Sequence, residues 1–278
     1  MKQTPVQMIP WHQRWGFDVQ EFAAGGIRTF AVTEGRDDAV PILFVHGLPG
    51  GSFVWAPVIS ALGRSRRSIA PDLPGWGQSV SRYEAAKPDL SPSGLQQWLN
   101  DVLSAQHIER FDLVAQGSGA WPALELLADN PARVRRLALV SPCLWPKPQS
   151  FFEKVQKRLI HRDQWTAKRV ERWLRQDVRL SSEANETWGL LLRQSIGTGF
   201  DEAAYESRFP TYRQALTNYQ GAMLLMWGER DPAADPEAIT LLSAGLDRPE
   251  VQEITGAGHL PMLEKSAETA RIFQEFLL

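Results

Sequence analysis

Residues 115–119, with the sequence Ala-Gln-Gly-Ser-Gly, lie where this chain would be expected to present a nucleophile. The apolar run from Phe111 to Ala115 predicts a strand, and small residues lead from it into a helix expected to open at Ser118. A strand–turn–helix elbow of the pattern G-x-S-x-G needs small residues two positions before and after its serine, because the turn is tight. Ala115 and Gly119 meet this requirement only if Gly117 stands at the nucleophile position.

Ser118 supplies a hydroxyl one residue later, and it fits the pattern less well. If Ser118 were the nucleophile, Gln116 and Ala120 would occupy the two small positions. We therefore prefer the register that places Gly117 at the nucleophile position. The backbone there costs a non-glycine residue about 1–3 kcal/mol, whereas glycine adopts it freely. This register predicts a stable elbow that lacks its own nucleophile.

An aspartate and a histidine near the end of the chain have the residue types for general-base catalysis. An imidazole with a pKa near 6.5 accepts and returns a proton near neutral pH, so His259 is the candidate base. Asp231 would accept the other imidazole proton, fix the tautomer and stabilise the imidazolium. The chain order of elbow, acid and histidine is the order that elbow-type enzymes use.

Composition limits the class of protein and its partners. The chain has 278 residues, 43% of them hydrophobic, and a formal net charge of −2. These values allow a large core and give no bulk electrostatic reason for binding nucleic acid or a membrane surface. The single cysteine, Cys143, excludes an internal disulfide and a cysteine-based zinc site, and we expect no metal and no other cofactor. With no apolar stretch of about 18 residues and no signal-peptide core, we expect a soluble cytoplasmic protein, a monomer or homodimer, that acts on a small molecule.

The apolar pattern predicts an α/β domain. Alternating residues at 19–22 and 27–32 predict an early antiparallel hairpin. Continuous apolar runs at 42–45, 68–70, 113–115, 137–140 and 223–227 are typical of strands buried on both faces of a parallel sheet. Between them, residues 91–103 predict a helix with Ser91 as its cap and Pro92 in its first turn, and residues 264–278 predict a last helix. Strand–helix alternation of this kind indicates a layered α/β fold.

The stretch between residues 141 and 219 contains no convincing strand. It is too long for a connection within a compact domain, so we interpret 142–218 as a helical cap inserted into a core of residues 1–141 and 219–278. The first part of the cap is basic, which is usually a solvated helix face.

Four motifs resemble those of the α/β-hydrolase superfamily, especially its capped branch of haloalkane dehalogenases, epoxide hydrolases and carbon–carbon bond hydrolases. They are His46-Gly47-Leu48-Pro49-Gly50, Asp72-Leu73-Pro74-Gly75-Trp76-Gly77-Gln78-Ser79, Trp227-Gly228-Glu229-Arg230-Asp231-Pro232 and Gly256-Ala257-Gly258-His259-Leu260-Pro261. The resemblance implies a mostly parallel eight-stranded sheet flanked by helices, with a cap. It also implies that the backbone N–H groups of Leu48 and Ser118 form an oxyanion hole.

The same resemblance implies an enzyme that acts on a small ester, amide or carbon–carbon substrate. His46 is expected to shape the oxyanion loop and, with Gly47 and Trp145, to lie against the substrate. The many tryptophans favour an apolar, aromatic pocket and therefore a hydrophobic substrate, although core packing explains most tryptophans equally well.

Four hypotheses remain open for the elbow. In the first, Ser118 attacks the substrate after activation by His259. In the second, the protein resembles the lyases, decarboxylases and cofactor-free oxygenases of the superfamily, and His259 with Asp231 activates water or removes a substrate proton without a covalent intermediate. Alternatively, Gly117 was introduced in place of a serine to trap a substrate complex. In the fourth hypothesis the protein binds a ligand without catalysis, which the retained Asp231 and His259 argue against.

Overall fold

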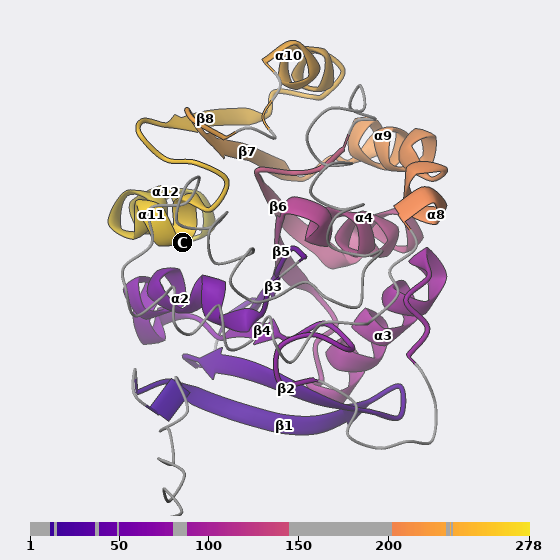
Figure 1. Cartoon of the computed structure of the whole chain (residues 1–278), viewed down its shortest axis with the longest axis vertical. Helices are drawn as coiled ribbons and strands as arrows, with labels where there is room; N and C mark the ends of the chain where they lie inside the picture. Colours follow the sequence, from indigo (N-terminus) through magenta and orange to yellow (C-terminus); the bar gives the residue numbers. More distant parts are fainter. Residues whose placement is uncertain are drawn as a thin grey trace, which may run out of the picture.

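The computed structural model describes residues 12–13, 16–36, 39–48, 50–79, 88–144, 202–231, 234 and 236–278. Its centre is an eight-stranded sheet in the order β1-β2-β4-β3-β5-β6-β7-β8 (Figure 1). The strands are β1 (Asp18–Ala24), β2 (Ile27–Glu34), β3 (Ile42–Val45), β4 (Ser68–Pro71), β5 (Phe111–Gln116), β6 (Val134–Val140), β7 (Ala222–Gly228) and β8 (Glu250–Ile254). β1 and β2 pair antiparallel, β2 pairs antiparallel with β4, and all remaining pairs are parallel. The expected mostly parallel α/β sheet is confirmed.

The strands follow from the local sequence. Gly25 and Gly26 join β1 to β2 with φ of +56° and +75°, the left-handed values that a tight hairpin turn requires. β3, β4 and β5 are buried along their whole length, which explains why most of their residues are apolar; Ser68, Asp112 and Gln116 are the polar residues among them. β8 was not expected from the sequence. Three of its five residues are exposed, and its alternating composition gives no apolar run.

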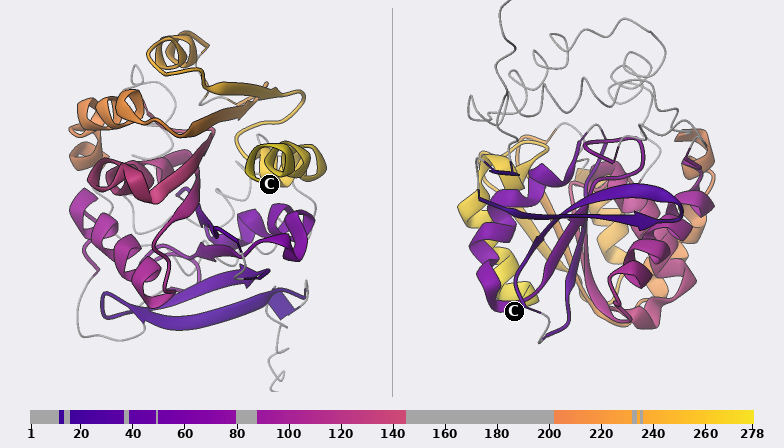
Figure 2. Two further views of the ribbon diagram at one scale, coloured as in Figure 1. Left: turned by 180° about the vertical axis from the view of Figure 1, so that it is seen from behind. Right: turned by 90° about the horizontal axis from the view of Figure 1, so that it is seen from below.

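Helices cover both faces of the sheet, as the right view of Figure 2 shows. α2 (Ala56–Leu62), α11 (Pro261–Glu264) and α12 (Ser266–Leu277) pack together on one face, where Trp55, Phe44 and Phe273 form an aromatic contact in the core. α3 (Pro92–Ala105), α4 (Ala120–Asp129) and α9 (Phe209–Asn218) cover the other face, and α10 (Pro236–Ala244) lies beside β7. Short 3-10 turns occupy Ser52–Trp55, Gly63–Ser65, Gly117–Gly119 and Pro131–Arg133.

The predicted helix starts are close to the observed ones. Ser91 caps α3, since its hydroxyl accepts from the backbone N–H of Gly94 at 3.1 Å, and Pro92 is the first residue of the helix. The helix expected to open at Ser118 begins at Ala120, after the 3-10 turn. The last helix begins at Ser266, after the separate turn of α11.

Most of the expected cap, residues 145–201, lies outside the described residues, so the division into core and cap stays a prediction. The described end of the expected cap forms α8 (Glu202–Glu206) and α9. Arg208 joins this part to the core through a double ion pair with Glu125 of α4, at 2.7 and 2.8 Å. Trp121 of α4 also stacks on Tyr205, with ring centroids 5.3 Å apart. No helix among the described residues is both long and apolar enough to cross a bilayer.

The two edges of the parallel sheet differ in character. At the amino ends of the strands, the buried carboxylate of Asp112 accepts from Arg66 at 2.7 Å and from Arg135 at 2.6 and 2.8 Å. At the carboxyl ends, the loops after β3, β4, β7 and β8 carry the four family-like motifs, and the loop after β5 is the elbow at 115–119. Because parallel strands all end at one edge, the fold brings these loops together there.

Candidate active site

The elbow after β5 has the predicted geometry at Gly117. β5 ends at Gln116, and Gly117 has φ of +55°, in the left-handed region that strains a residue with a side chain. A Cβ atom on Gly119 would collide with the backbone of His46 and Val45, so this position requires the absence of a side chain. The tight approach at Gly119, two residues after Gly117, agrees with the preferred register.

Gly117 faces the histidine. A Cβ atom built on Gly117 lies 3.3 Å from Nε2 of His259 and 3.9 Å from its Cε1. Any side chain at position 117 would therefore point at the nitrogen of the candidate general base. A glycine brings no atom to that point.

Asp231 and His259 lie side by side, although they follow different strands. Asp231 comes after β7 and His259 after β8, and Nδ1 of the imidazole is 3.0 Å from Oδ1 of the carboxylate. The Asp231 side chain is fully buried, whereas 11% of the His259 side chain is exposed. Because a carboxylate only accepts, Nδ1 carries the proton and the imidazole is held in a fixed orientation.

Two carboxylates that the sequence did not single out hold the histidine loop. Glu264 of α11 accepts from the N–H of Gly258 at 2.9 Å and from the N–H of Leu260 at 3.0 Å. Glu229 accepts from the N–H of Gly256 at 2.7 Å. These contacts fix the loop on both sides of His259 and were not visible in a linear sequence.

Gln116 is a further residue of the site that the sequence argument passed over. Its Nε2 lies 3.0 Å from Nε2 of His259 and 3.4 Å from the His259 carbonyl oxygen. Its Oε1 accepts from the N–H of Gly47 at 3.1 Å. The Gln116 side chain therefore joins the oxyanion loop to the histidine, and only 3% of the residue is exposed.

Ser118 contacts the other expected donor of the oxyanion hole. Its hydroxyl oxygen accepts from the backbone N–H of Leu48 at 2.9 Å. The structure thus brings Leu48 and the Ser118 side chain together, while the oxyanion hole expected from their two backbone N–H groups stays a prediction. The hydroxyl proton of Ser118 is not used by this bond, because the oxygen acts as the acceptor.

His46 shapes the oxyanion loop from behind. It is fully buried, its Nδ1 bonds to the Gly47 carbonyl at 2.9 Å, and its Nε2 accepts from the N–H of Leu73 at 2.8 Å. Burial lowers its pKa to about 4, so the ring is neutral at physiological pH. With both nitrogens occupied, His46 acts on the site through the positions of Gly47 and Leu73.

Asp72 supports the same loop from the end of β4. Its carboxylate accepts from the N–H of Ser52 at 2.5 Å and from the N–H of Gln78 at 2.7 Å. Burial raises its pKa to about 6, although both hydrogen bonds oppose the rise. Asp72 thereby ties the segment after the oxyanion loop to the turn at 75–78.

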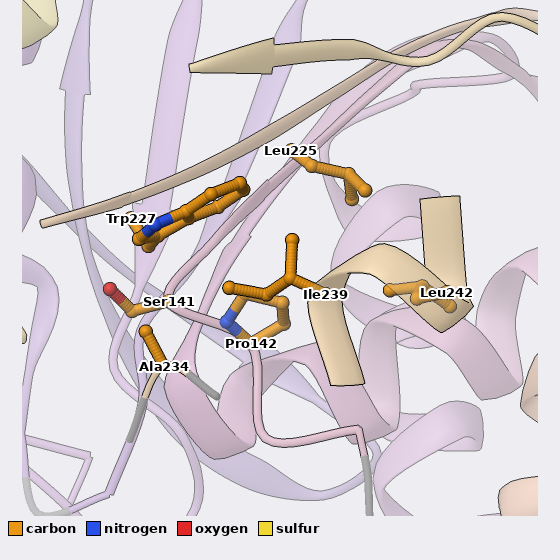
Figure 3. Close-up of a pocket in the computed structure, with 7 residues that line it drawn as sticks. All are labelled: Ser141, Pro142, Leu225, Trp227, Ala234, Ile239 and Leu242. Atoms are coloured by element: carbon orange, nitrogen blue, oxygen red, sulfur yellow. The ribbon is translucent and has the colours of Figure 1, made fainter. Parts of the chain in front are cut away.

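A small apolar hollow of about 10 Å³, about the space that a single water molecule needs, borders the acid turn (Figure 3). In the figure, Trp227 of β7 and Ile239 of α10 face each other across it, and the Ser141 oxygen points away from Ile239. Ala234, which also lines the pocket, donates its N–H to the Asp231 carbonyl at 3.0 Å. The remaining lining residues are Pro142, Leu225 and Leu242.

The other expected site residues are only partly described. Cys143 is half-buried, and its backbone N–H donates to the Gly117 carbonyl at 3.2 Å. Trp145 lies outside the described residues, so its expected contact with substrate stays a prediction. Across the described ranges, no group of three or more His, Cys, Asp or Glu side chains is arranged to hold a metal ion.

The fold and this site define an α/β-layered enzyme with a histidine–aspartate pair at the carboxyl edge of its sheet. The sequence pattern of the Alpha/beta hydrolase family matches residues 42–272. The chain therefore belongs to the alpha/beta hydrolase family, a family of enzymes, as the sequence motifs predicted.

Named relatives cover several reactions. The chain is 27% identical over 287 residues to 2-hydroxymuconate semialdehyde hydrolase from Pseudomonas sp. (strain CF600), covering 93% of each protein. It is 34% identical over 115 residues to a haloalkane dehalogenase from Psychrobacter cryohalolentis, covering 40% of this chain and 37% of the dehalogenase. The crystal structure of naproxen esterase from Bacillus subtilis matches with a TM-score of 0.75 and 20% identity, covering 96% of this chain and 94% of the esterase. That last likeness concerns the fold alone.

Proposed function

We propose that this protein is a hydrolase of a small, hydrophobic carbonyl compound, an ester, amide or carbon–carbon substrate, in which His259 activates water. The observation that carries this proposal is the position of Gly117. Its Cα faces the base, and a Cβ built there lies 3.3 Å from Nε2 of His259. Position 117 thus brings no side chain to Nε2, and a water molecule can bind there once the Gln116 amide, 3.0 Å from Nε2, moves aside.

The proposed reaction needs no covalent enzyme intermediate. Nε2 of His259 takes a proton from water while the water oxygen attacks the substrate carbonyl carbon, and the carbonyl electrons move to the oxygen. Asp231 stabilises the imidazolium that forms, since its carboxylate lies 3.0 Å from Nδ1. When the tetrahedral intermediate collapses, the imidazolium returns its proton to the leaving group.

The backbone N–H groups of Leu48 and Ser118 would stabilise the oxyanion. The Leu48 N–H now bonds to the hydroxyl of Ser118, so the substrate oxygen must displace that hydroxyl. The exchange is favourable because a hydrogen bond to a charged oxygen is roughly twice as strong as one between neutral groups.

The substrate class rests on the pocket and on the relatives. Apolar side chains such as Trp227 and Ile239 surround the acid turn and favour a hydrophobic substrate there, although the hollow between them is itself only water-sized. The relative that spans 93% of this chain is named as a hydrolase of 2-hydroxymuconate semialdehyde, a small carbonyl compound. Gly47 and Trp145 remain proposed substrate neighbours, whereas His46, expected to be a third, is fully buried with both ring nitrogens bonded and acts through the loop it supports. The cap, the cytoplasmic location and the oligomeric state remain predictions.

The alternative nucleophile, Ser118, gives the sharpest test. We expect Ser118→Ala to lose less than ~10-fold in the rate of hydrolysis of small aromatic esters, because its backbone N–H is kept, whereas His259→Ala should lose at least ~10²-fold. A fluorophosphonate serine probe should leave the intact mass of the unaltered protein unchanged. Labelling at Ser118, or an inactive but folded Ser118→Ala variant, would overturn the proposal.

A further inference from the structure

The side chain of Gln116 makes contacts that settle the orientation of its amide. One end faces the N–H of Gly47, which can only donate, so that end must be the oxygen. The other end faces the carbonyl oxygen of His259, which can only accept, so that end must be the NH2 group. The amide thus has one orientation that satisfies both backbone groups.

This orientation determines what Nε2 of His259 does. The Gln116 NH2 group lies 3.0 Å from Nε2, and a hydrogen bond between the two requires Nε2 to accept. On the other side of the ring, the Asp231 carboxylate requires Nδ1 to donate. Both neighbours therefore select the same neutral form, with the proton on Nδ1 and a lone pair on Nε2.

We infer that Gln116 is a positioning residue that holds His259 in the neutral form competent to act as a base, in the place where a nucleophile's hydroxyl would otherwise bond to the ring. If Nε2 of His259 were protonated, its N–H would face the NH2 group of Gln116, and two donors cannot form a hydrogen bond with each other. The amide cannot relieve this contact by turning over, because Gly47 N–H and the His259 carbonyl would then both face the wrong group. A hydrogen bond to the neutral form disfavours the charged form, so Gln116 opposes protonation of the ring.

The same contact has a consequence for the reaction, and this part rests on the proposed function. Nε2 has a single lone pair in the plane of the ring, and the attacking water must donate to it. The Gln116 NH2 group must therefore move aside when water binds, while its oxygen can stay on Gly47. Gln116 keeps the base unprotonated before catalysis and competes with water for it.

Other charged groups also act on this loop. The Asp231 carboxylate bonds to the ring, Glu264 accepts from the two residues beside His259, and Glu229 and Arg230 both bond to Gly256. The test must leave all four in place. Replacing Gln116 alone meets this condition.

The first measurement is nitrogen NMR of the unaltered protein carrying 15N-labelled histidine, with His259 assigned from the spectrum of His259→Gln. We expect an unprotonated nitrogen at Nε2 and a protonated one at Nδ1 near neutral pH. A proton on Nε2 in the neutral ring would overturn the inference. The experiment needs no substrate, so its failure is separate from a failure of the proposed hydrolysis.

The second measurement compares Gln116→Glu and Gln116→Leu with the control Gln20→Glu, which adds the same charge at an exposed position of β1. A carboxylate beside Nε2 should raise the NMR pKa of His259 by about 1–3 units, and leucine should raise it less by removing only the donor. Gln20→Glu should leave it within a few tenths of a unit. Equal pKa values in the unaltered protein and all three variants would overturn the role of Gln116.

Discussion

Glu264 holds His259 from both sides, since one carboxylate accepts from the N–H of Gly258 and from the N–H of Leu260. The base therefore stands on a short loop whose two flanking peptides are tied to the first turn after it. This arrangement orients the ring without touching it, and it leaves Nδ1 to Asp231 and Nε2 to the site.

We predict that Glu264→Ala lowers the free energy of unfolding by about 2–4 kcal/mol, because two N–H groups lose a charged acceptor. Hydrolysis should fall as well, through a misplaced ring. Urea unfolding followed by tryptophan fluorescence measures the first effect. The matched control is Glu268→Ala on the exposed side of α12, which should change the stability by less than about 0.5 kcal/mol. Equal effects of the two variants would contradict the prediction.

Gly117→Ser should create a serine that reacts with a fluorophosphonate probe, because its side chain would point at Nε2 of His259. The positive φ should cost the variant about 1–3 kcal/mol of stability. Gly117→Ala is the control: it should pay the same strain and give no labelling. Intact-mass spectrometry reads the labelling and thermal unfolding reads the strain. A folded Gly117→Ser protein that stays unlabelled would refute the register.

His46 and Asp72 should give opposite pH dependences of stability over nearly the same range. The pKa of Asp72 is raised from 3.8 to about 6 in the folded protein. Its contribution to the free energy of unfolding is therefore complete below pH 4 and is lost as pH rises to 6. His46 has its pKa lowered from 6.5 to about 4, so its contribution is complete above pH 6.5 and is lost as pH falls to 4. Each change amounts to about 3 kcal/mol, and the two nearly cancel in the unaltered protein.

Denaturant unfolding between pH 4.5 and 7 separates the two contributions. The stability deficit of Asp72→Asn relative to the unaltered protein should shrink as pH rises. The deficit of His46→Gln should grow over the same interval. Deficits that do not vary with pH would show that neither group titrates as its burial requires.

Asp112→Asn should lower the free energy of unfolding by about 3–5 kcal/mol, because Arg66 and Arg135 would then face a neutral, buried side chain. The exposed pair of Arg28 and Glu21 offers the comparison, and Glu21→Gln should cost less than about 1 kcal/mol. Asp112 lies at the amino ends of the parallel strands, whereas the site lies at their carboxyl ends, so kcat of the folded variant should stay unchanged. Calorimetry and ester hydrolysis on the same samples check both statements, and similar unfolding energies for the two variants would refute the first.

The sequence predicted most of the sheet because burial on both faces leaves a direct trace. β3 and β7 are apolar from end to end or nearly so, and β5 has an apolar run at 113–115. Short apolar runs of this kind are typical of strands buried on both faces of a parallel sheet. β8 left no such trace, since it lies at the edge of the sheet with Val251 44% exposed. The tertiary pairing of β8 with β7, rather than its own composition, makes it a strand.

Residue type and order were enough to single out Asp231 and His259, whose side chains lie 3.0 Å apart in the structure, although their catalytic role stays a prediction. Gln116 escaped because its role depends on which way a side chain turns. It bonds to Gly47, 69 positions earlier, and to His259, 143 positions later. A sequence motif covers only a few neighbouring residues, so it reveals neither of these contacts. Without them, Gln116 is simply a polar residue beside a turn.

These separations also bear on how the molecule comes into being. The contacts of Gln116 require strands from the beginning, middle and end of the chain to lie in one sheet, and closing contacts so far apart in sequence costs loop entropy that slows folding. A nascent or partly folded chain therefore lacks an assembled base, however much of its secondary structure is present. A reagent that reacts only with the assembled site would therefore measure the fraction of fully folded molecules and would not detect partly folded ones.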